Sequence, residues 1–155
     1  MSEAIHMRLS PDAQVKQAIV AYLRGVCGGF SNPIPAEQIR GLLDVSGTPK
    51  DAYGIVVGCD NLGEHWGANN RGILIDVKPR VVVFTHINED SDGSLCDALV
   101  SDVLDAMRRI EYELDGWHVA WGGNWSAGEC VMEESFRQSV LSATMPLVRQ
   151  FDLGF

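Results

Sequence analysis

The sequence has few basic residues and no long apolar run. Its 155 residues include 12 lysines and arginines against 21 aspartates and glutamates, which gives a formal net charge of −9 at pH 7. Proteins that coat nucleic acid need clustered lysine and arginine to neutralise phosphates, so the charge argues against that class. No apolar run approaches the ~18 residues of a membrane-spanning helix. The first residues lack a basic region followed by an apolar stretch, so we expect no secretory signal.

Local motifs for catalysis and metal binding are also missing. The sequence has no GxSxG, no P-loop and no GxGxxG. Its four cysteines are widely spaced without a CxxC pair, so we expect reduced, partly buried thiols: Cys27, Cys59, Cys96 and Cys130. The histidines form no close pair of the kind that binds zinc. We therefore predict no enzyme, no cofactor and no catalytic or metal-binding residue. A small metal- or cysteine-dependent enzyme that uses His65 and Cys59 is the alternative from another class.

The composition is that of one globular domain covering residues 1–155, with 46% apolar and 21% charged residues. Residues 30–52 contain three prolines and indicate an excursion over the surface, with a short helix at 36–43. Glycine and asparagine indicate loops at 60–71 and 122–130. Hydrophobic periodicity predicts the remaining elements. They are helices at 11–26 and 94–114, and strands at 53–59, 72–87, 117–121 and about 130–151.

This order of elements predicts an α+β fold. An antiparallel or mixed sheet would carry the N-terminal helix and the central helix on one face. Ser10 and Pro11 are typical of a helix start, as cap and first-turn residue. Ser94 and Asp97 resemble a capping arrangement for the central helix. Pro79 and Pro146 fall inside long strands, which indicates strand edges or bulges at those positions.

Two groups of residues are candidates for contacts with partners. Trp66 and Trp125 fall in predicted loops, where a tryptophan is either a local hydrophobic plug or an interface anchor. Together with Pro79 and Pro146, at predicted strand edges, they form the candidate interface. Both hints favour assembly over catalysis, because an oligomer can pair sheet edges that a monomer must protect.

The acidic residues are concentrated in one segment. Between Asn88 and Asp115 lie nine acidic residues and only two basic ones, so this segment carries most of the net charge. The segment forms either a solvated helix face or a functional surface, such as a salt-bridging interface or a wall that repels phosphates. We predict that its acidic side faces solvent, a lumen or a basic partner. The residues of this candidate face are Glu89, Asp90, Asp92, Asp97, Asp102 and Asp105.

The layout resembles the tail terminator (tail completion) proteins of long-tailed bacteriophages, including the minor tail protein U type. The matching pieces are Pro11–Val26, Tyr53–Cys59, Gly72–Ile87, Ser94–Leu114 and Trp117 onward to Phe151. Residues 132–140 are similar to the family's last strand. The resemblance lies in the order and texture of elements across most of the chain. The chain departs from the pattern in its longer proline-containing stretch and its Trp- and Gly-rich hairpin.

The resemblance implies a structural virion protein of the tail or neck, assembled in the host cytoplasm. Such a protein forms a homohexameric ring that caps the tail tube and joins the tail to the head–neck connector. Its partners would be the tail tube protein and a neck protein, with no membrane. DNA would pass through the lumen without specific binding, and an acidic lumen suits that passage. Another neck, head–tail connector or minor tail protein is the alternative within virions.

Overall fold

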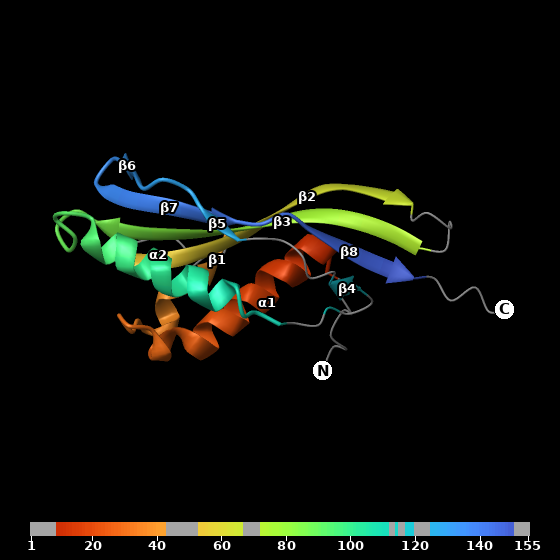
Figure 1. The fold of residues 1–155 in the computed structure, drawn as a ribbon, viewed down its shortest axis with the longest axis horizontal. Coiled ribbons are helices and arrows are strands. Elements are labelled where there is room, and N and C mark those ends of the chain that lie inside the picture. The colour runs from red at the N-terminus through yellow and green to blue at the C-terminus, as the bar shows by residue number, and fades with distance from the viewer. Residues whose placement is uncertain are drawn as a thin grey trace, which may run out of the picture.

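The computed structural model describes residues 9–42, 53–66, 72–111, 114, 117–119 and 125–150, and it has the predicted α+β fold. Both α-helices lie on one face of a mixed sheet (Figure 1). The helical elements are α1 (Pro11–Val26), η1 (Cys27–Gly29), η2 (Ala36–Gln38) and α2 (Ser94–Met107). The strands are β1 (Ile39–Gly41), β2 (Tyr53–Trp66), β3 (Gly72–His86), β4 (His118–Val119), β5 (Ser126–Ala127), β6 (Val131–Glu133), β7 (Phe136–Ser142) and β8 (Met145–Gln150).

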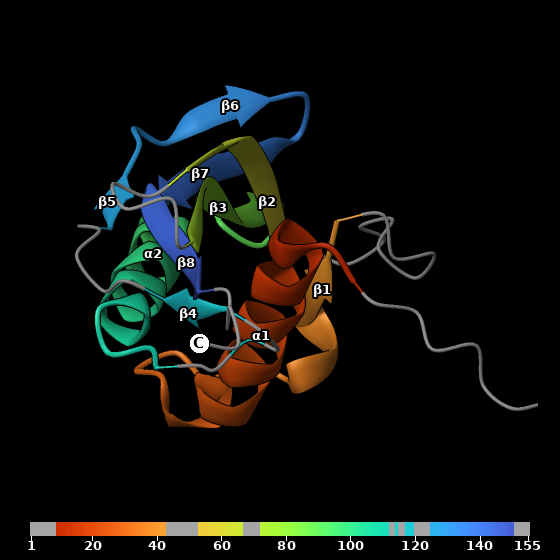
Figure 2. The same ribbon diagram turned by 90° about the vertical axis from the view of Figure 1, so that its right-hand side faces the viewer.

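Strand β3 is the centre of the sheet. It pairs with β2 along one side, and along the other side it pairs first with β8 and then with β7. Strands β5 and β6 both pair with β7, while β4 pairs with β8. All of these pairs are antiparallel, and among the described strands only β1 runs parallel to its neighbour β2. The end-on view shows the helices below the curved sheet and β6 on the side away from them (Figure 2).

Helix α1 has the predicted bounds because residues within and directly before the helix determine both where it begins and which of its faces is buried. The Ser10 hydroxyl accepts a hydrogen bond from the Ala13 N–H at 3.4 Å, and Pro11 occupies the first turn. Val15, Ile19 and Leu23 follow at four-residue spacing and are fully buried. This stripe packs on β1, β2 and β3.

The prediction for helix α2 was right in its start and wrong in its length. The helix ends at Met107, not at 114. The Ala106 carbonyl accepts the Tyr22 hydroxyl at 2.9 Å and the Arg109 N–H at 3.1 Å, so the last turn tightens and the chain leaves the helix. Ser94 is the first helical residue and not the cap. That position belongs to Gly93, which has a φ of 85°.

Two predictions for the first half of the chain were wrong. A helix at 36–43 is replaced by η2 and β1, because Ile39–Gly41 pair with β2 and Ile39 is fully buried. The predicted loop at 60–71 is strand as far as Trp66, and 67–71 lie outside the described residues. The turn-like residues Asn61 to Gly63 form a bulge in β2, because the long β3 offers a partner strand beyond it.

The predicted final strand, about 130–151, is three strands. A turn at Glu134 and Ser135 separates β6 from β7, and the pairing with β3 is broken between Ser142 and Met145. Pro79 stands opposite this break, in a central strand, and it is buried. The prediction that it marks a strand edge was therefore wrong: a proline is tolerated there because the neighbouring ladder is interrupted. Pro146 is the second residue of β8, just after the break.

One core lies between the sheet and the helices. It contains the alternate residues of β2, β3, β7 and β8 that face α1 and α2. Each fully buried aliphatic side chain contributes about 1.5–3 kcal/mol relative to exposure, so this layer fixes which face the helices cover. No helix in the described part of the chain is long and apolar enough to cross a membrane.

Candidate interaction surface

The sheet face opposite the helices, called here the open face, carries apolar side chains. Val56 on β2 pairs with Val82 on β3, and Val82 pairs with Val140 on β7. Their chain neighbours face the core, so strand alternation places all three valines on the open face. Val140 is 37% exposed. A row of valines therefore crosses three strands without a covering element among the described residues.

Aromatic rings continue the open face beside the valine row. Phe84 on β3 lies over Gly54, where a Cβ atom would come within 2.8 Å of the phenylalanine Cζ. Phe136 on β7 meets Phe84 edge to face, with 5.8 Å between ring centroids, and meets His86 in the same way at 5.1 Å. Such edge-to-face contacts fix the rings in place. The aromatic rings of Phe84, Phe136 and His86 thus pack together on the open face.

A groove of about 450 Å³ runs over this part of the open face. Its apolar residues come from the position directly after β1, from β2, from β3 and from β7. Its polar residues are Glu133 at the end of β6, Glu134 in the turn that follows and Gln138 on β7. The lining comprises Leu42, Val56, Val82, Phe84, Phe136, Gln138, Glu133 and Glu134.

Exposed apolar side chains also follow the β6 edge. Strand β6 pairs only with β7 among the described strands, so its other side is an open sheet edge. Val131 is 49% exposed and pairs with Gln138, and Met132 is 52% exposed and pairs with Arg137. Val140 follows Gln138 by two residues on β7, on the same face as Val131. We call Val131, Met132 and Val140 the β6–β7 edge surface. A monomer that exposes an apolar edge strand carries a tendency to associate.

The predicted interface residues are not brought together. Trp125 is 7% exposed and belongs to the hydrophobic core. Its interpretation as an interface anchor was therefore wrong, and the alternative interpretation, local hydrophobic packing, is correct. Pro79 is buried in the central strand. Pro146 is half-buried at the start of β8. Trp66 ends β2, and its side chain lies outside the described residues.

The predicted acidic face is exposed in part. Glu89, Asp92, Asp97 and Asp105 are exposed, and the side chain of Asp105 forms an ion pair with Arg109. Asp102 is half-buried and accepts hydrogen bonds from the backbone N–H groups of Ser31 and Asn32, both at 3.2 Å. The acidic side of α2 therefore does face outward, apart from Asp102, which ties α2 to the segment after η1.

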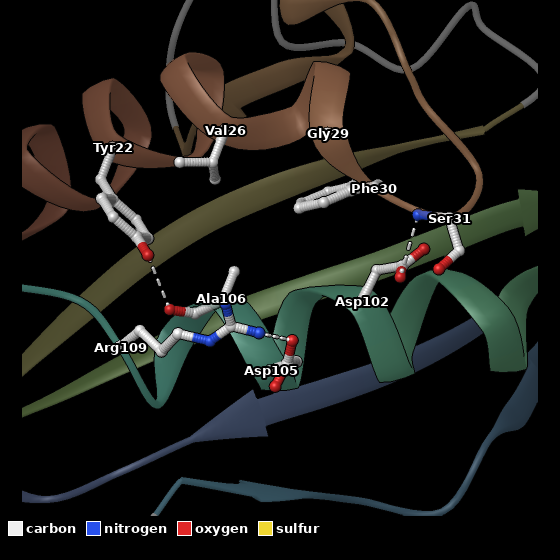
Figure 3. Close-up of a pocket in the computed structure, with 9 residues that line it drawn as sticks. All are labelled: Tyr22, Val26, Gly29, Phe30, Ser31, Asp102, Asp105, Ala106 and Arg109. Carbon is white, nitrogen blue, oxygen red and sulfur yellow. Dashed lines mark hydrogen bonds and ion pairs between the residues drawn. The ribbon is translucent and has the colours of Figure 1, made fainter.

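These side chains border a hollow of about 230 Å³ between the end of α1 and α2 (Figure 3). Asp102 points to the Ser31 N–H, the Asp105 carboxylate meets the Arg109 guanidinium, and Tyr22 reaches the Ala106 carbonyl. The side chains of Tyr22, Asp102, Asp105 and Arg109 are thus bonded within the chain. We therefore interpret the hollow as part of the packing contact between the two helices.

Asp90 is the residue of the acidic set that the prediction placed wrongly. Its side chain is 3% exposed and accepts hydrogen bonds from the Thr85 hydroxyl at 2.8 Å, the Leu95 N–H at 3.0 Å and the Cys96 N–H at 2.9 Å. Burial alone would raise the pKa of Asp90, but these hydrogen bonds outweigh burial and lower it. Asp90 thus caps α2 from inside the fold and cannot face a lumen.

The cysteines are free and differ in environment. Burial raises the pKa of Cys59 to about 12, and burial together with the adjacent Cys130 thiol raises that of Cys96 to about 12. Both are therefore protonated at neutral pH and poor nucleophiles. The Sγ atoms of Cys96 and Cys130 are 4.0 Å apart. In the described part of the chain, no three His, Cys, Asp or Glu side chains gather to hold a metal ion.

The sequence prediction missed the residues of the groove and of the β6–β7 edge surface. One signal was present: residues 81–84 are apolar on both faces of a strand, whereas a strand with one solvated face alternates. The contribution of Leu42 and Phe136 could not be found that way, because it depends on which strands become neighbours. The sequence matches no protein-family model, and no curated protein matches it at a significant level.

Proposed function

We propose that this chain is a structural virion protein of the tail-terminator type, forming a ring that caps the tail tube and joins the tail to the head–neck connector. The observation that carries the proposal is the β6–β7 edge surface, where an apolar edge strand is exposed in the isolated chain. A ring of identical copies covers such an edge, because head-to-tail contacts place it against a different surface of the next copy. The order of helices and strands supports the same family.

The distribution of charge agrees with this role. The outward side of α2 carries exposed carboxylates, whereas the edge surface on β6 and β7 is apolar. Apolar contacts between copies and an acidic wall toward DNA therefore need not compete for the same surface. Like charge would keep passing DNA from sticking to such a wall.

Mass photometry and negative-stain imaging of the purified protein test the proposal. We expect ring particles of about six copies with a central hole, either alone or on the ends of tail tubes. A protein that stays monomeric both alone and within assembled particles would contradict the proposal. Deleting the gene separates the two virion roles. Tails of abnormal length indicate a terminator, whereas normal free tails beside DNA-filled heads indicate a head-side connector.

A further inference from the structure

The groove on the open face combines an apolar floor with an acidic rim. Val56, Val82 and Phe84 form the floor, and Leu42, which is 46% exposed, stands at one side. Glu133 and Glu134 stand at the other side, at the turn between β6 and β7. Glu133 accepts a hydrogen bond from the Gln138 amide, and no described cation pairs with either glutamate.

Within the described part of the chain, most basic side chains are engaged elsewhere. Six of the described lysines and arginines bond to backbone carbonyls or carboxylates of this chain. They are Lys16, Arg24, Arg40, Arg80, Arg109 and Arg137. A second copy carries a net charge of −9, so its overall charge opposes contact with the two glutamates. Nucleic acid and anionic lipid are disfavoured there for the same electrostatic reason.

We propose that the groove binds an extended segment of a different protein, in which aliphatic side chains lie next to lysine or arginine. The aliphatic side chains would cover Val56, Val82 and Phe84, and the cation would meet Glu133 and Glu134. Apolar contact supplies the affinity of such a surface, and the charge pair at the rim sets orientation and partner choice. The inference rests on the proposed function, because it names the kind of partner that a ring component of the tail would dock.

Selection from a random decapeptide library displayed on yeast tests the inference with the intact protein as bait. We expect enriched sequences to carry two or more aliphatic residues with a lysine or arginine within three positions. Leu42→Glu should weaken binding of the enriched peptides about tenfold or more, because it places a charge in the apolar wall. Leu62→Glu is the matched control, since Leu62 is 55% exposed on β2 and does not line the groove.

A second pair of variants tests the acidic rim. Glu133→Gln with Glu134→Gln should weaken binding of the same peptides about tenfold at low salt and by less at high salt, because salt screens the pair. Glu89→Gln with Glu111→Gln removes two exposed charges elsewhere and should change nothing. Circular dichroism and thermal midpoints verify that each variant is folded.

Several outcomes would overturn the inference. They are the absence of enriched peptides, enriched peptides without cations, or equal binding by the Leu42→Glu variant. Ring formation is read separately by mass photometry of the unaltered protein. Rings without peptide selection would therefore reject the groove's partner alone, and peptide selection without rings would reject the proposed function alone.

Discussion

Asp90 belongs to the acidic segment between Asn88 and Asp115 by its position in the sequence, but its side chain does not belong to the exposed acidic face. It lies inside the fold and satisfies the N–H groups of Leu95 and Cys96. A cap usually precedes the helix by one residue, whereas Asp90 reaches the first turn across an intervening bend. Sequence spacing therefore identified a capping signal and assigned it to the wrong residues.

Replacement of Asp90 by alanine should destabilise the protein. The variant leaves the Thr85 hydroxyl and two helix N–H groups without their acceptor in a buried place. We expect a loss of about 2–3 kcal/mol in the free energy of unfolding, measured by urea denaturation. Glu89→Ala, one residue earlier and exposed, should cost less than about 0.5 kcal/mol. Equal losses in the two variants would show that Asp90 does not cap α2.

The same carboxylate should make stability depend on pH in the acid range. The pKa of Asp90 is lowered in the fold, so the unfolded chain binds the proton more readily. The stabilisation is complete above the unfolded value of about 4 and is lost as the pH falls through the folded pKa. Urea denaturation from pH 6 to pH 3 should therefore show a steeper loss in the unaltered protein than in Asp90→Asn. Parallel curves would contradict this assignment.

At the scale of elements, sequence predicted best what is decided locally. Helix α1 carries its cap, its first-turn proline and its buried stripe within its own sequence, and its bounds were predicted correctly. Strand β2 was cut short at Cys59 because the residues that follow resemble a turn. They are a bulge only because β3 lies alongside. The short β1 likewise exists through its pairing with β2.

The candidate interaction surface was predictable only in part, because it also depends on contacts between segments that are distant in the sequence. Trp125 was a candidate because tryptophan in a glycine-rich segment serves either a core or an interface, and local sequence does not separate the two. Val82 and Phe84 lay in a strand that is apolar on both faces, which already indicated a second buried or contacting surface. The acidic rim of the groove depends on the β6–β7 turn, which was predicted as continuous strand.

The packing of β2 against β3 makes a prediction for a pair of glycines. A Cβ atom on Gly54 would lie 2.8 Å from the Phe84 Cζ and 2.9 Å from the Gln38 backbone oxygen. Gly54→Ala should therefore cost about 1–3 kcal/mol, because overpacking forces the ring or the backbone to shift. A Cβ atom on Gly58 would come no closer than 3.4 Å, to the Leu42 side chain, with the Arg80 side chain at 3.9 Å, so Gly58→Ala should be nearly neutral. Thermal unfolding of both variants compares them, and a neutral Gly54→Ala would mean that the Phe84 ring is not fixed.

At the scale of the whole molecule, the exposed carboxylates of α2 and the apolar floor of the groove lie on opposite sides of the sheet, and Glu133 and Glu134 add an acidic rim on the open face. Both α-helices lie on one side of the sheet (Figure 1). The exposed Asp97 and Asp105 belong to α2, whereas the valine row and the groove belong to the opposite face of the sheet. The net charge of −9 therefore does not prevent contact through the sheet. The protein therefore presents a mainly apolar surface on the open face and an acidic surface on the outward side of α2.

Assembly through the β6–β7 edge surface gives the last prediction. Val140 is 37% exposed in this surface, so Val140→Glu leaves the core untouched but would bury an unpaired carboxylate between copies. An uncompensated charge in an apolar contact costs several kcal/mol, about 3–5 where it has been measured, and each ring repeats that cost at every interface. We expect monomers from Val140→Glu in mass photometry, at concentrations where the unaltered protein forms rings.

Thr144→Glu adds the same charge at an exposed position beyond the end of β7 and should keep the rings. If Val140→Glu rings persist, the contact between copies lies elsewhere on the chain. If Thr144→Glu also dissociates them, added charge as such, and not this surface, controls the assembly.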